Sequence, residues 1–211
     1  MPTTHLPLLQ PGDKPLQVDP STLRSPRAFK TAVSSCHRCP LADDRVKVVP
    51  GSGAENADVV IVGTAPGRQE DVQGNPFMGA AGNVIDNALA AIGFRRQDVL
   101  LTTLVKCHPP QDRRPSALEL ETCFPWYVEQ IAMHRPKVIV ALGELPTQAM
   151  LRRNVPISRV AGLRLSVFDD IILLPTHDPA DALRGNARAA AAIRRDIAVA
   201  MSIAGAVAQP A

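Results

Sequence analysis

Four short apolar runs constrain the fold of this chain more than any other feature. They lie at residues 58–62, 99–105, 137–142 and 171–174. Runs of this length and character are typical of strands buried on both faces of a sheet. The segments between them carry helical spacing, so strands alternate with helices along the chain. This alternation predicts an α/β fold with a parallel sheet covered by helices on both faces.

Capping and periodicity predict the helices around these strands. Ser116 and Glu119 have the spacing of a capping box, which opens a helix that runs to about His134. The other predicted helices span residues 25–35, 79–92, 145–153 and 186–201, and an edge strand is predicted at 163–168. We expect an extended proline-containing arm at residues 1–24, a single domain at 25–204 and a flexible tail at 205–211.

Composition limits the partners and the compartment. The chain has 211 residues, a formal net charge of +3 and only 3% aromatic residues. The positive charge suits a polyanion, whereas the shortage of aromatic residues excludes a broad surface for stacking bases. The sequence has no apolar run long enough for a transmembrane helix and no signal-peptide pattern at its start. We therefore expect a cytoplasmic monomer that does not bind membranes.

Four cysteines predict a metal centre. Cys36 and Cys39 form a CxxC pair, and Cys107 and Cys123 follow at wider spacing. Structural disulfides are rare in the reducing compartment expected here. Four thiolates from three chain segments can ligate zinc or an iron–sulfur cluster, and the spacing alone does not choose between them. The alternative is that all four are free thiols and the CxxC pair is accidental.

Three loops follow predicted strands at the sheet edge where ligands bind in such folds. The first contains two glycines and a proline, the acidic pair Glu70 and Asp71, and Phe77, which belongs either to the core or to a stacking site for a flat ring. The second holds Arg113 and Arg114 among prolines, as a phosphate contact would. The third contains His177, Asp178 and, further on, Arg184. Each polar residue also has a plain structural interpretation as a solvated turn or a cap.

Taken together, these segments resemble the family 4 uracil-DNA glycosylases. The resemblance covers residues 33–200, through CxxC at Cys36, GxAPGxxED at Gly63, GxPFxGxAG at Gly74, VKCxPP at Val105 and PTxxP at Pro175. It implies a three-layer α/β/α sandwich with a four-stranded parallel sheet. It also implies a DNA substrate and a [4Fe–4S] cluster on the four cysteines, which favours iron over zinc.

The same resemblance assigns candidate site residues. The base-binding candidates are Gly63, Ala65, Pro66, Gly67, Phe77 and Thr103. The catalytic candidates are Thr64, Glu70, Asp71, His177 and Asp178. The phosphate-binding candidates are Arg113, Arg114 and Arg184, and the cluster ligands are Cys36, Cys39, Cys107 and Cys123.

Three of these positions depart from the family pattern. Family members usually carry a carboxylate where this chain has Thr64, an asparagine that recognises uracil where it has Thr103, and a histidine where it has Asp178. The flanking prolines align Asp178 with that histidine without a gap, so only a local distortion would bring His177 into its role. A threonine hydroxyl cannot copy an amide, and an ionised aspartate would repel an anionic leaving base.

These departures predict weak or absent excision of uracil. One explanation is a glycosylase adapted to another base, such as a bulkier modified pyrimidine, that acts in repair or in restriction of foreign phage DNA. In that case Asp178 stabilises the sugar cation, activates water or protonates the leaving base. The other explanation is a catalytically inactive iron–sulfur homologue that still binds DNA.

Overall fold

A six-stranded sheet forms the centre of the computed structural model, which describes residues 25–168 and 170–206. The strand order is β1-β3-β2-β4-β6-β5. The strands are β1 (Ser52–Gly53), β2 (Val59–Gly63), β3 (Leu100–Thr103), β4 (Val138–Leu142), β5 (Leu165–Val167) and β6 (Ile171–Thr176).

The inner four strands confirm the predicted parallel sheet. β3, β2, β4 and β6 pair in parallel, and every residue of β2, β3 and β4 is buried. Two antiparallel edge strands complete the sheet. β5 is the predicted edge strand, whereas β1 was not predicted, because its two residues are too few to carry a pattern.

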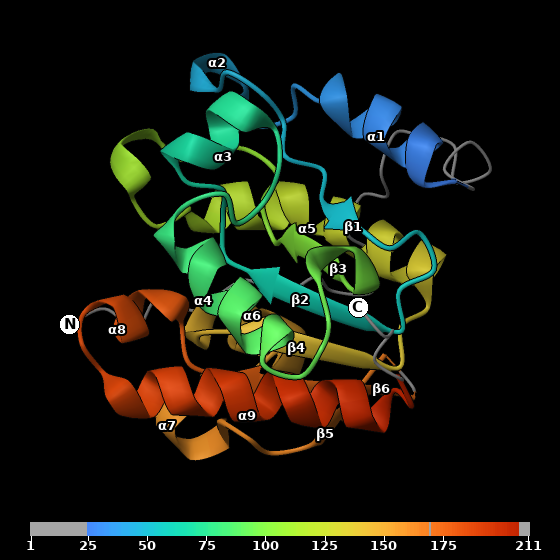
Figure 1. Cartoon of the computed structure of the whole chain (residues 1–211). Coiled ribbons are helices and arrows are strands. Elements are labelled where there is room, and N and C mark those ends of the chain that lie inside the picture. Colours follow the sequence, from blue (N-terminus) through green and yellow to red (C-terminus); the bar gives the residue numbers. More distant parts are fainter. Residues whose placement is uncertain (1–24, 169, 207–211) are drawn as a thin grey trace.

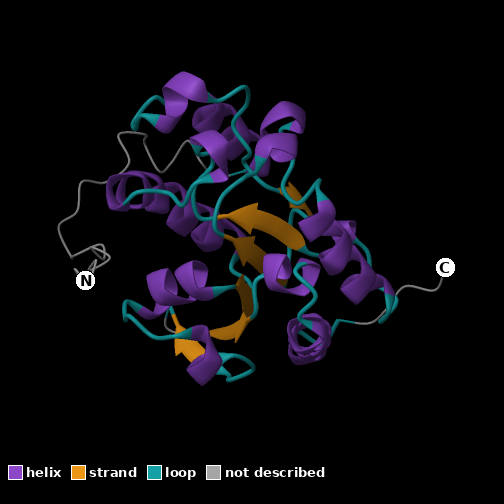
Figure 2. Ribbon diagram, turned by 90° about the vertical axis from the view of Figure 1, so that its left-hand side faces the viewer, coloured by secondary structure: helices purple, strands orange, loops and turns teal. Residues whose placement is uncertain are grey.

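Helices cover both faces of the sheet, which gives the three layers visible in Figures 1 and 2. On one face α4 (Ala80–Ala90) and α9 (Ala187–Ile203) pack on the odd-numbered residues of β2, including Ile61. On the other face α1 (Pro26–Ser34), α5 (Ala117–His134) and α6 (Glu144–Leu151) pack on the even-numbered residues, including Val60. The alternation follows from the two-residue period of a strand.

All five predicted helices are present, with ends shifted by at most a few residues, and Ser116 caps α5 through the predicted box with Glu119. Short elements were not predicted. They are α2 (Leu41–Asp44), α3 (Arg68–Gln73), η2 (Arg96–Asp98), η3 (Pro110–Asp112), α7 (Ile157–Val160) and α8 (Pro179–Leu183). Such short segments are too brief to show helical periodicity.

The chain ends are described only in part. The predicted arm at residues 1–24 lies outside the described residues, as do residues 207–211 of the predicted tail. Gly205 and Ala206 still donate backbone hydrogen bonds to the end of α9. No helix in the described ranges is both long and apolar enough to cross a bilayer.

Gly53 offers a test of the close contact between β1 and β3. Its φ is +118°, and a Cβ there would lie 1.9 Å from the carbonyl oxygen of Val99. Gly185 also has a positive φ, but a Cβ there would meet no atom within 4 Å. We expect Gly185→Ala to cost about 1 kcal/mol from backbone strain and Gly53→Ala to cost at least about 1 kcal/mol more. Equal losses in urea unfolding would contradict the clash.

Candidate functional site

A cavity of about 530 Å³ lies at the carboxyl edge of the parallel strands. The loops after β2, β3, β4 and β6 all contribute to its wall. The cavity therefore lies where the chain crosses from one side of β2 to the other, the usual place for a ligand in an open α/β sheet. Its lining residues are Thr64, Ala65, Pro66, Gly67, Pro109, Asp112, Arg113, Arg114, Pro115, Gly143, Glu144, Leu145, Ile157, Asp178 and Asp181.

Glu70 joins the two halves of the loop region after β2. One carboxylate oxygen accepts a hydrogen bond from the backbone N–H of Gly67 at 3.0 Å. The other accepts from Met78 and Gly79 at 2.7 and 3.1 Å. The side chain is 9% exposed and does not line the cavity. Both oxygens hold the loops in this structure, and a catalytic role for Glu70 stays a prediction.

Asp71 is also committed to the backbone. Its oxygens accept hydrogen bonds from the N–H groups of Val46 and Lys47, at 3.0 to 3.2 Å, and the residue is 5% exposed. It therefore fastens the segment after α2 to α3, outside the cavity. A catalytic role for Asp71 likewise stays a prediction.

Gly63, Phe77 and Thr103 come together beside the cavity without lining it. A Cβ on Gly63 would lie 2.9 Å from the ring of Phe77 and 3.8 Å from the methyl group of Thr103. The Thr103 hydroxyl donates a hydrogen bond to the carbonyl oxygen of Val105 at 2.7 Å and is buried. Thr103 therefore presents its methyl group, and not its hydroxyl, toward Gly63.

Asp178 lines the cavity and caps α8. One carboxylate oxygen accepts a hydrogen bond from the N–H of Ala180 at 2.8 Å, and the other lies beside Gly143. Burial raises the pKa of the Asp178 carboxyl, while the Ala180 N–H opposes the shift. His177 precedes Asp178, is partly buried and does not line the cavity.

The three predicted phosphate-binding arginines differ in how they are engaged. Arg113 forms two hydrogen bonds, at 2.6 and 2.8 Å, with the buried carboxylate of Glu119. This contact lowers the pKa of Glu119. Arg184 pairs with Asp181 at 2.5 Å and does not line the cavity. Within the described residues the Arg114 side chain forms no ion pair, so it is the arginine of the three that is open to a ligand.

All four cysteines surround one small cavity at the end of α1 and the middle of α5. Three N–H donors point at their sulfur atoms. Lys106 donates its backbone N–H to Cys123 at 3.2 Å, and the side chains of Arg45 and Trp126 donate to Cys107 and Cys36 at 3.4 Å. Hydrogen bonds of this kind stabilise thiolates that bind iron.

The four thiols around one cavity form a donor set that an iron–sulfur cluster uses. Burial raises the pKa of Cys123 to about 12, so its thiolate requires a positive partner.

Residues after β4 were missed by the sequence analysis. Gly143, Glu144 and Leu145 line the cavity and belong to the loop at the carboxyl end of that strand. The rule that drew attention to three other strand ends applied equally to this one. The stop of the apolar run at Gly143 was the signal that could have found them.

The comparisons with known proteins agree with the geometry. The family model for the uracil DNA glycosylase superfamily matches residues 50–198. A type-4 uracil-DNA glycosylase of Archaeoglobus fulgidus is 44% identical over 134 residues, which are 62% of this chain and 67% of that protein. One of Saccharolobus solfataricus is 35% identical over 72% of this chain and 74% of its own length. A type-5 enzyme of Pyrobaculum aerophilum is 32% identical, with 64% and 75% covered.

The family model covers well over half of the chain, and the type-4 relatives of Archaeoglobus fulgidus and Saccharolobus solfataricus are each covered over two thirds or more of their length. The fold, the position of the cavity and the four gathered cysteines fit the same assignment. The chain is therefore a member of the type-4 uracil-DNA glycosylases, within a superfamily of enzymes that hydrolyse N-glycosyl bonds in DNA.

Proposed function

We propose that this DNA glycosylase excises a modified pyrimidine in place of uracil. The observation that carries the proposal is the state of Thr103. Its hydroxyl is bonded to the Val105 carbonyl, so only a methyl group faces Gly63 and the Phe77 ring. An amide at this position offers a donor and an acceptor to the edge of uracil, whereas the single hydroxyl proton of Thr103 is already donated to the backbone.

The loss of that pair affects discrimination directly. A good bidentate contact to a base contributes about 1–3 kcal/mol of selectivity. A methyl group and an aromatic ring instead favour contact with an apolar substituent on the base. Thr64 lines the cavity without the negative charge that relatives carry there, so it cannot assist the sugar cation electrostatically. The changes at Thr103 and Thr64 support a base whose hydrogen-bonding edge and leaving-group chemistry differ from those of uracil.

Asp178 is the residue that we assign to acid catalysis. Burial raises the pKa of the Asp178 carboxyl, which favours its protonated form relative to an exposed aspartic acid. The protonated carboxyl donates its proton to the leaving base as the bond between C1′ and the base nitrogen breaks; water then adds its hydroxyl to C1′ and returns its other proton to the Asp178 carboxylate. An ionised Asp178 would repel an anionic base, so a base that leaves as a neutral, protonated species suits this site.

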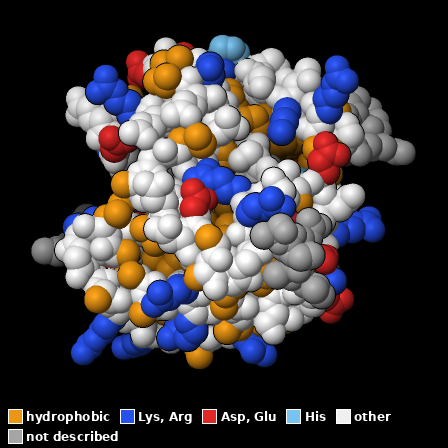
Figure 3. Space-filling model, viewed as in Figure 1, with side chains coloured by type: hydrophobic (Ala, Val, Ile, Leu, Met, Phe, Trp, Pro, Cys, Tyr) orange, Lys and Arg blue, Asp and Glu red, His pale blue; other side chains and the backbone are white. Residues whose placement is uncertain are grey.

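DNA is held at the cavity mouth. Arg114 lines the cavity and is free to contact a phosphate, and the loop that carries it is braced by neighbouring prolines. Figure 3 also shows basic side chains along the lower edge of the molecule in this view, where Figure 1 places α9. Positive charge near the cavity and beyond it favours a nucleic acid that extends past the flipped base.

Cys36, Cys39, Cys107 and Cys123 would hold the [4Fe–4S] cluster. When bound, the cluster supplies a positive iron core that neutralises the buried thiolates and ties the segment before α2 to α5. Arg45, Lys106 and Trp126 orient and hydrogen-bond the sulfurs, as described above. We assign the cluster no part in cleavage of the glycosidic bond, because none of the four cysteines lines the 530 Å³ cavity.

The competing function is an inactive homologue that binds DNA and a cluster. The observation that favours it is the capping bond of Asp178, which gives this side chain a structural reason to be present. The two functions differ in one measurable property, the formation of abasic sites.

A panel of DNAs tests the proposal. Oligonucleotides with uracil, hypoxanthine or modified cytosines are incubated with the protein and cleaved with alkali. We expect excision of a modified pyrimidine and a uracil rate at least about 10²-fold lower than on the preferred base. On the cleaved substrate Asp178→Asn should lower the rate by about 10²-fold or more, because asparagine keeps the cap but cannot transfer a proton.

The pH dependence of the excision rate tests whether Asp178 acts as an acid. The parent rate should fall as pH rises through the raised pKa of Asp178, and Asp178→Asn should lose that dependence. Asp181→Asn, which also changes a carboxylate of the cavity wall, is the matched control and should keep it. Fast uracil excision would refute the change of base, and the absence of any cleaved base would leave the inactive homologue.

We expect substitution of Arg114 to affect DNA affinity and substitution of Arg113 to affect protein stability. Arg114→Ala should weaken DNA binding and reduce the slope of log K against log salt by about one, because one phosphate contact is lost. Arg113→Ala should instead lower stability, since it leaves the buried Glu119 carboxylate unpaired. Fluorescence anisotropy at several salt concentrations and urea unfolding measure the two effects. An unchanged slope for Arg114→Ala would exclude this contact.

Anaerobic purification tests the cluster. We expect a brown protein with about four irons per chain and little zinc. Cys107→Ser should lose the colour and most of the iron, whereas Asp181→Asn, which changes a residue of the main cavity that does not line the cysteine cavity, should retain both. Stoichiometric zinc in the anaerobic parent protein would overturn the assignment.

A further inference from the structure

The turn that carries Phe77 has an unfavourable backbone conformation. Phe77 has φ of 55°, in the left-handed region that bulky residues rarely adopt. Such a conformation persists only when the surrounding structure fixes it from several sides. The contacts of residues 76–79 show how this is achieved here.

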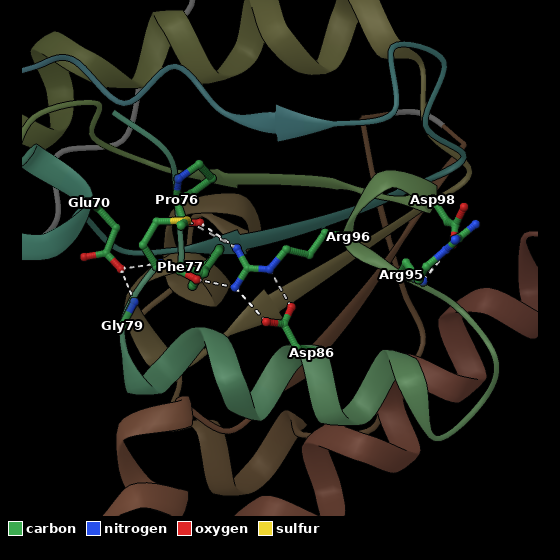
Figure 4. Close-up of polar contacts among 9 residues, drawn as sticks. Glu70, Pro76, Phe77, Gly79, Asp86, Arg95, Arg96 and Asp98 are labelled. Atoms are coloured by element: carbon green, nitrogen blue, oxygen red, sulfur yellow. Dashed lines mark hydrogen bonds and ion pairs between the residues drawn. The ribbon is translucent and has the colours of Figure 1, made fainter. Parts of the chain in front are cut away.

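Arg96 holds the carbonyl groups of the turn, as Figure 4 shows. Its guanidinium donates one hydrogen bond to the carbonyl oxygen of Pro76 at 3.2 Å and another, short one to the carbonyl oxygen of Phe77. On the opposite side, Glu70 accepts from the N–H groups of Met78 and Gly79. The carbonyl groups of the turn are therefore held by the Arg96 guanidinium, and its N–H groups are held by the Glu70 carboxylate.

Asp86 on α4 fixes Arg96 in turn. Its two oxygens accept from Nε and Nη2 of Arg96 at 2.5 and 2.9 Å, in the forked geometry that only arginine offers. Gly82 lies one turn earlier on the same helix. A Cβ there would lie 1.8 Å from the Phe77 carbonyl oxygen and 2.6 Å from the Arg96 guanidinium, so a glycine is required for the approach.

The fixed backbone determines where the ring lies. The Phe77 ring occupies the space that a Cβ on Gly63 would take, at the carboxyl end of β2 and close to the Thr103 methyl group. Gly63 is the residue that leads directly into the cavity loop at Thr64. The ring is thus positioned next to the cavity before any ligand binds.

We infer that Arg96, held by Asp86, is the positioning residue that fixes the Phe77 ring as one wall of the base site. The inference rests on the proposed function for the presence of a base, but the placement of the ring by Arg96 does not. Lysine cannot replace Arg96, because one ammonium group cannot reach both carbonyl groups and both oxygens of Asp86.

Fluorine NMR of protein labelled with 4-fluorophenylalanine tests the placement. The chain has five phenylalanines, and the Phe77 resonance is assigned by its loss in Phe77→Leu. We expect Arg96→Lys and the milder Asp86→Asn to shift or broaden this resonance and to leave the other four in place. Arg95→Lys is the matched control, since Arg95 is exposed and its side chain lies away from the turn. An unchanged Phe77 resonance in both Arg96→Lys and Asp86→Asn would overturn the inference.

A second measurement separates positioning from simple stabilisation. On a cleaved substrate, Arg96→Lys should lower kcat by about tenfold or more at saturating DNA with little change in KM, because a misplaced wall affects the flipped base more than the phosphate contacts. Equal kcat values for Arg96→Lys and Arg95→Lys would contradict the role in the reaction. If no DNA is cleaved, the proposed function fails, and the fluorine comparison still tests the placement of the ring.

Discussion

The buried carboxylate of Glu70 is the interaction on which the site depends. A carboxylate away from water is costly unless hydrogen bonds compensate it, and here three backbone N–H groups do so. Those donors come from the start of α3 and from the turn that follows it. One side chain therefore sets the distance between the cavity loop and the Phe77 turn.

The differences from the family pattern are concentrated where they cost the fold least. Thr64 and Asp178 lie just beyond strand ends, and Thr103 is the last residue of β3. None of them is needed by the two apolar clusters that hold the helices on the sheet. A threonine that bonds its own strand end and an aspartate that caps a short helix are both locally satisfied. The stability of the domain is thus largely independent of the chemistry of its cavity, which permits a change of base.

The parallel strands and the long helices could be predicted from the sequence, because each repeats a pattern over many residues. The capping box at Ser116 could be predicted from its fixed spacing to Glu119. The sequence was also sufficient to bring the cysteines and the strand ends into consideration. It could not assign Glu70 and Asp71, since an acidic pair in a glycine-rich loop has the same appearance whether it faces a ligand or the backbone. The Arg113 bond to Glu119 was equally hidden, because both residues look exposed in the sequence. Contacts between a side chain and groups distant in the sequence produce no repeating sequence pattern from which they could be predicted.

Helix α5 connects the cysteine cavity to the loop that carries Arg114. Glu119 and Cys123 lie one turn apart on the same buried face, the first bonded to the loop that carries Arg114 and the second gathered with the other cysteines. Four residues of helix span only about 6 Å, so the two ends of this segment move as one rigid body. Oxidative loss of the proposed iron centre would therefore reach the DNA-binding loop through a single turn of helix. If the cluster and the Arg114 contact are as proposed, we expect cluster damage to weaken DNA binding before the sheet itself unfolds.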